Sequence, residues 1–178
     1  ILTMFHMATV AKAAYQKAEN KVELSSMSVY KDMDISFLKD FPFGTQSGKE
    51  ATVQFSTAQE MIDSNSKKLT EGKLVQTQGF YTEGDGGAGV YLLCEKDPDS
   101  AITLSNGLYA QLIPDVKTID GKKWAIVSAN QFGVCRDGSE SANAAISQTV
   151  AAANAAAGLE QVDRAIAYFP EGEYKCTT

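Results

Sequence analysis

The densest chemical signal in the chain is a glycine-rich segment between aromatic residues. Residues 84–89 read Gly-Asp-Gly-Gly-Ala-Gly, with Tyr81 before them and Tyr91 after them. Such loops can cradle phosphate, because glycine allows backbone conformations that a Cβ atom forbids. Here no Lys or Ser/Thr follows the glycines, and residues 90–94 predict a strand, not a helix whose N-terminus could hold a pyrophosphate. Asp85 would also repel an anion. The segment therefore predicts a glycine-built turn or bulge between paired strands.

A short acidic cluster could supply oxygen ligands to a hard cation such as Ca²⁺: Glu95, Asp97 and Asp99. The spacing matches no EF-hand loop, and Pro98 within the cluster favours a turn in solvent. A solvated turn is therefore the better interpretation.

Two carboxylate pairs have the composition of a general acid and base: Glu171 with Glu173, and Asp137 with Glu140. Nothing in the sequence marks either pair as desolvated, and neighbouring carboxylates are common. We therefore nominate no catalytic, cofactor-binding or metal-binding residue, and whether the intact protein is an enzyme stays open.

Composition excludes several classes of function. The net charge is -6 across 178 residues, so no basic surface is available for nucleic acid. Apolar runs such as residues 89–94 are too short to cross a membrane, and the first residues lack the features of a signal peptide. The one histidine, His6, leaves little room for a triad or a metal site. Cys94, Cys135 and Cys176 form no CxxC pair and are interpreted as buried free thiols.

Three helices are predicted. Residues 6–23 are rich in alanine, with small apolar side chains at three- and four-residue spacing. This helix could pack on a partner assembly or on its own domain. Residues 57–72 begin with Thr57 and Glu60 at the spacing of a capping box and end at Gly72. The third helix covers residues 144–157 and stops at Gly158.

The strands are predicted from β-branched and aromatic runs bounded by turn residues. They cover residues 52–55, 74–81, 90–95, 108–113, 125–134 and 165–169, and a turn at 170–174 leads into another strand. Residues 116–126, which contain Trp124, are interpreted as a polar connection.

The order of these motifs resembles proteins of bacteriophage tails. The segments 74–81, 84–91 and 106–112 resemble a module common in tailspikes and tail fibres. Downstream, Gln131-Phe-Gly133, Asp137-Gly138, the Ala145-Ile146 helix and residues 168–174 (Tyr-Phe-Pro-Glu-Gly-Glu-Tyr) resemble the opening of a pectate-lyase-like right-handed β-helix. The second aspartate that often follows the Asp-Gly turn in that family is absent.

This resemblance implies a fold that is α+β leading into all-β. The expected parts are a virion-attachment helical segment (1–49), a small α+β neck domain with the glycine-rich loop (50–115), and a linker, cap helix and first rung of a right-handed parallel β-helix (116–178). Because the chain begins with Ile and ends on Tyr-Lys-Cys-Thr-Thr, we expect a piece of a longer protein.

By the same resemblance, the chain is the tail-proximal attachment and capping region of a homotrimeric spike in the virion. Phage tail or baseplate proteins are the expected partners of its N-terminal segment, and a missing C-terminal part would bind host surface polysaccharide. Many relatives degrade such glycans with carboxylates on later rungs. No cofactor, nucleic acid or membrane is implied. The alternative is the N-terminal part of a secreted cellular polysaccharide lyase or glycoside hydrolase with a β-helix fold.

Overall fold

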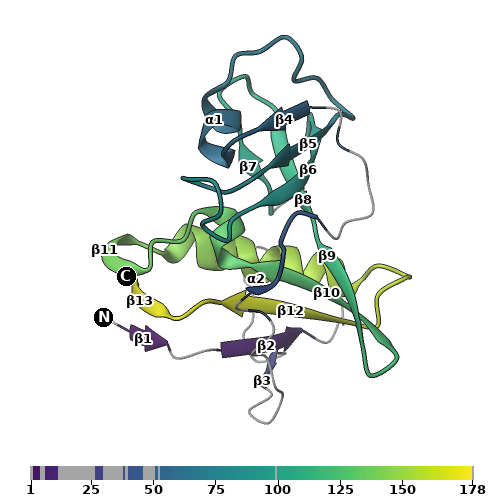
Figure 1. The fold of residues 1–178 in the computed structure, drawn as a ribbon, viewed down its shortest axis with the longest axis vertical. Helices are drawn as coiled ribbons and strands as arrows, with labels where there is room; N and C mark the ends of the chain where they lie inside the picture. The colour runs from purple at the N-terminus through teal and green to yellow at the C-terminus, as the bar shows by residue number, and fades with distance from the viewer. Residues whose placement is uncertain are drawn as a thin grey trace.

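The strands that the structure describes form three sheets (Figure 1). The structure is a computed structural model that describes residues 2–4, 7–11, 27–29, 38, 40–45, 51, 53–98 and 100–177. For β1 to β3, only the backbone is described.

The first sheet is built from one continuous stretch of the sequence. Its order is β4 (Val53–Phe55), β5 (Leu74–Thr77), β6 (Gly89–Cys94), β8 (Tyr109–Ile113) and β7 (Ile102–Thr103). Only β4 and β5 are parallel, and the short helix α1 (Ala58–Asp63) lies between them in the chain. The Thr57 side chain accepts a hydrogen bond from the Glu60 N–H, so the predicted N-terminal cap is confirmed.

The second sheet has the order β3 (Met27–Val29), β2 (Met7–Ala11), β12 (Arg164–Phe169), β10 (Lys122–Ser128) and β9 (Asp115–Ile119). Helix α2 (Asn143–Ala157) lies against β10 and β12, and its small side chains let the helix approach the sheet closely. The opposite face carries a separate buried cluster in which Phe43 stacks on Tyr168.

The third sheet has the order β1 (Leu2–Met4), β13 (Gly172–Lys175) and β11 (Asp137–Ser141). β10 pairs with β12, and β11 pairs with β13, in both cases in parallel. Two consecutive strand–turn–strand units therefore lie side by side, with α2 between them in the sequence. We refer to these four strands as the parallel stack.

The predicted helix at residues 6–23 is wrong where the structure describes it. Residues 7–11 form β2, which pairs with β12 and β3, and residues 12–23 lie outside the described residues. Alanine favours a helix, but Thr9 and Val10 are β-branched, and pairing on two neighbours outweighs a weak local preference.

Two further boundaries differ from the prediction. Helix α1 ends at Asp63, and the chain turns twice before Gly72, where φ is +75°. The predicted polar connection at 116–126 is an antiparallel hairpin of β9 and β10. Its turn is Asp120-Gly121, with both residues at positive φ, which is a recognised hairpin signal.

The remaining predicted elements are confirmed, some with shorter bounds. The strand predicted at 74–81 ends at Thr77, and residues 78–81 belong to the connection that follows it. The predicted strand at 125–134 is shorter, because residues 129–132 form a 3₁₀ turn (η3, Ala129–Phe132). Strands β7 and β11 are additional, and α2 ends at Ala157, directly before Gly158 as expected.

Candidate functional site

The glycine-rich segment connects two paired strands, as predicted. β5 and β6 are antiparallel, with Thr77 opposite Gly89, and residues 78–88 form the connection. We call residues 78–88 the glycine loop. The loop reaches the turn at residues 128–133, and the two together are called the latch.

Asp85 organises the glycine loop from within. Its carboxylate accepts hydrogen bonds from the backbone N–H groups of Phe80 (3.0 and 3.1 Å), Tyr81 (2.8 Å), Thr82 (3.1 Å) and Gly87 (2.8 Å). Charge-assisted bonds of this kind are about twice as strong as neutral ones. The sequence indicated Asp85 only as a residue that disfavours anions, and its positive role in closing the loop was missed.

Side chains on both sides join the two parts of the latch. The Asn130 amide donates to the Asp85 backbone carbonyl (3.0 Å), and the Gln131 amide donates to the Ala88 carbonyl (2.9 Å). In the other direction, the Tyr91 hydroxyl donates to the Gln131 carbonyl and the Tyr81 hydroxyl to the Gly133 carbonyl, both at 2.9 Å. Burial raises the pKa of Tyr91 far above its ordinary value, so its hydroxyl stays a donor.

Two glycines allow this close contact. A Cβ on Gly87 would lie 2.6 Å from the Asn130 carbonyl oxygen, and one on Gly133 would lie 2.3 Å from the Phe80 ring. Gly133 also has φ +69° at the end of η3. The structural interpretation of the glycines is therefore confirmed, although their role extends beyond a turn between strands.

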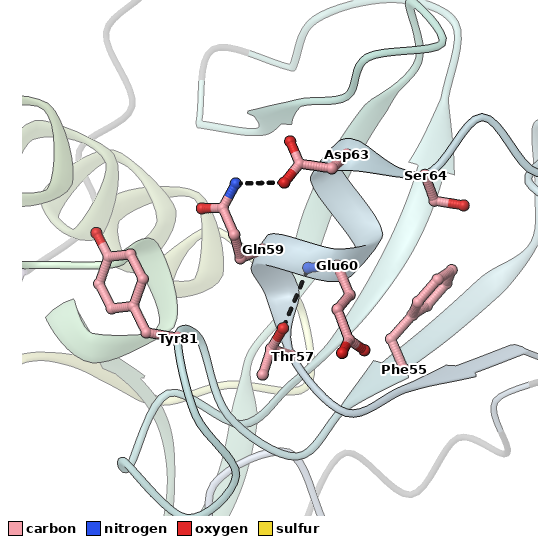
Figure 2. Close-up of a pocket in the computed structure, with 7 residues that line it drawn as sticks. All are labelled: Phe55, Thr57, Gln59, Glu60, Asp63, Ser64 and Tyr81. Carbon is pink, nitrogen blue, oxygen red and sulfur yellow. Dashed lines mark hydrogen bonds between the residues drawn. The ribbon is translucent and has the colours of Figure 1, made fainter.

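An open depression of about 670 Å³ lies beside α1. Its lining comes from β4, α1 and the start of the glycine loop, and Figure 2 shows the seven residues: Phe55, Thr57, Gln59, Glu60, Asp63, Ser64 and Tyr81. Gln59 donates to Asp63 (2.9 Å), and Glu60 accepts from the Ser56 N–H (3.2 Å). These groups suit hydrogen bonding to a polar ligand, and the lining has no nucleophile paired with a base.

The first N–H groups of α1 are not directed at this depression. Those of Ala58 and Gln59 donate to the carbonyls of Gly79 and Phe80, at 2.9 and 3.0 Å. The start of α1 is thus bonded to the glycine loop, and it offers no anion site.

The structure describes two of the three acidic candidates. Glu95 and Asp97 are exposed after β6, and Asp99 lies outside the described residues. No three His, Cys, Asp or Glu side chains of the described part of the chain are grouped to hold a metal ion.

The two carboxylate pairs are also separated in role. Asp137 accepts hydrogen bonds from the Cys135 thiol (2.8 Å) and the Ser139 N–H (2.9 Å), and these bonds lower its pKa well below the ordinary value. Burial raises the pKa of Tyr81, and the negative charge of Glu140 raises it further. Glu171 is exposed, whereas Glu173 packs against Gly138.

The three cysteines are free, as predicted, but none is fully buried. Cys94 and Cys135 are half-buried and Cys176 is exposed. Cys94 is the last residue of β6, and Cys176 follows the end of β13. His6 lies outside the described residues.

No protein-family profile matches the chain, and no curated protein matches it. Among solved structures, it is similar to the tailspike protein gp49 of Acinetobacter baumannii bacteriophage Fri1, a capsular polysaccharide depolymerase. That likeness has a TM-score of 0.32 at 18% identity, and it covers 48% of this chain and 14% of the tailspike. No helix within the described ranges is long and apolar enough to span a membrane. The chain thus has a weak structural similarity to one segment of a phage tailspike.

Proposed function

We propose that this chain is the tail-proximal attachment and capping region of a phage tailspike or tail fibre. The observation that carries the proposal is the parallel stack. β10 and β11 form one strand–turn–strand unit, β12 and β13 form the next, and each strand pairs in parallel with its counterpart. Such stacking is the construction of a parallel solenoid, whose first unit needs a cap.

The latch supports the same assignment. In this proposal the first sheet belongs to the neck and the parallel stack begins the body, so the two have to be joined. The glycine loop belongs to the first sheet, and the 128–133 turn belongs to the stack. Hydrogen bonds in both directions join them.

In this proposal the chain divides at 49 and 115 into attachment segment, neck domain and the start of a β-helix. The protein is a homotrimer in the virion, residues 1–49 bind tail or baseplate proteins, and a later part of the protein binds host surface polysaccharide. The chain itself has an architectural role.

Immunogold labelling tests this assignment. Antibody raised against the 178-residue chain should label the tails of purified phage particles from the source culture. Antibody absorbed beforehand with the chain is the control and should not label. Recovery of the protein only from particle-free culture fluid would contradict the proposal and favour a secreted polysaccharide-degrading enzyme.

The oligomeric state provides a second test. Light scattering after gel filtration should give three times the chain mass of 19.1 kDa. A monomer at all concentrations would oppose the trimeric spike.

A further inference from the structure

Residues 2–4 and 7–11 pair with one strand in each of the two sheets that contain the parallel stack. β2 runs antiparallel to β12, and β1 runs antiparallel to β13. Figure 1 shows these two purple strands following β12 and β13 along the same side of the molecule. Residues 2–11 therefore border both strands of the second unit.

The two ladders keep one register. Met7 lies opposite Phe169, and Met4 lies opposite Gly172. Each of the two paired segments is therefore three residues further along at the second ladder. Within the stack, by contrast, the pairing of β11 with β13 contains a register shift. The side of β12 and β13 that pairs with β2 and β1 is thus regular within both ladders.

An uncovered strand edge of this kind would be prone to pair with another chain. The free N–H and C=O groups of an edge strand pair readily with another chain, and charged residues or a covering segment normally prevent this. β12 has no charge from Ala165 to Phe169, and these residues are apolar, with two aromatic side chains. Short, uncharged strands with high β-propensity tend to pair with copies of themselves.

We propose that β1 and β2 form a strap that protects the edge of β12 and β13, and that this edge accepts a strand from a second copy of the chain when the strap is withdrawn. The partner strand is β12 of the second copy, because antiparallel pairing of two identical edges is self-complementary. The observations behind the strap are these two backbone ladders, and they do not require the chain to be part of a tailspike.

The double variant Thr9→Pro/Val10→Pro tests the strap. β2 lies between β12 and β3, so the N–H groups of two successive residues point to opposite neighbours. Replacing both with proline removes the donor on each side. Thr9→Ala/Val10→Ala is the matched control, because it changes the same side chains and keeps both N–H groups.

Two readouts are compared at equal protein concentration. In the proline variant, hydrogen exchange should become faster at residues 165–169 in dilute solution, and the mass by light scattering should at least double relative to wild type at high concentration. The alanine control should match wild type in both. Unchanged exchange at 165–169 would overturn the strap, and faster exchange without a rise in mass would overturn the acceptor edge.

Protection of the β6 and β8 amides against hydrogen exchange shows whether each variant is still folded. If the proline variant loses it, Thr3→Pro/Met4→Pro interrupts β1 alone, and exchange at residues 172–174, which pair with β1, replaces exchange at 165–169 as the readout beside the mass. Unchanged exchange at 172–174 would then overturn the strap. Wild type gives an independent check, because alternate N–H groups of β12 face β10 and β2. Fast exchange at every second residue of β12 in wild type would overturn the proposal.

Discussion

The latch and the strap both hold distant parts of the chain together, but by different means. The latch uses particular side chains and glycines: the Asp85 carboxylate, the Gln131 amide and the space at Gly133. The strap is described as two backbone ladders in one register. A single side-chain change should therefore break the first, and a change that removes backbone donors should break the second.

The largest effect is expected from Gly133→Ala. The new methyl group would overlap the Phe80 ring at a position that also has positive φ. We expect a loss of about 3 kcal/mol in the free energy of unfolding, measured by urea denaturation, since overpacking and backbone strain add.

Gly84→Ala is its matched control. Gly84 lies in the same loop at φ +79°, with nothing within 4 Å of the added Cβ. The cost there should be about 1 kcal/mol, from conformation alone. Equal losses in the two variants would mean that close contact at Gly133 contributes nothing to the latch.

Asp85→Ala should have the next largest effect. It removes the acceptor of four backbone N–H groups in a half-buried loop. The expected loss is about 2–3 kcal/mol, the range for a charged hydrogen-bonding group whose partners lose their acceptor. Glu83→Ala, an exposed change two positions away, should stay within about 0.5 kcal/mol of wild type.

Tyr91→Phe should cost less, about 1–2 kcal/mol, because it removes one buried hydrogen bond and leaves the ring in place. Thermal unfolding would measure this change. The Gln131 carbonyl should lose its partner without a change in the register of β5 and β6, which amide chemical shifts would report.

The smallest effect is expected in the latch when the strap is interrupted. Thr9→Pro/Val10→Pro should leave hydrogen exchange of the Phe80, Tyr81 and Gly87 amides unchanged, because their acceptor is within the loop. Faster exchange at these amides would show that the strap and the latch open together.

The sequence predicted the parts of the fold that depend on local patterns. Apolar and aromatic runs between turn residues located β6 and β8, and alanine followed by Gly158 located α2. The glycine loop was predicted as structural because the residues after it form a strand.

Tertiary pairing explains most of what the sequence could not predict. β2 is a strand because β12 and β3 lie beside it, which no local pattern reports. The contact of Gly87 with Asn130 joins residues that are far apart in the chain. The Asp120-Gly121 hairpin is different, since its turn signal was present in the sequence and was overlooked.

The position of Asp85 explains why a loop with the composition of a phosphate cradle needs no phosphate. Four backbone N–H groups converge on one carboxylate, so the loop carries its own anion as an internal ligand. In Asp85→Ala these four donors would converge on an empty position that attracts an anion. Added acetate or sulfate should then restore part of the lost stability in the variant and have a smaller effect on wild type. The loop is thus an anion receptor that is permanently filled by its own chain.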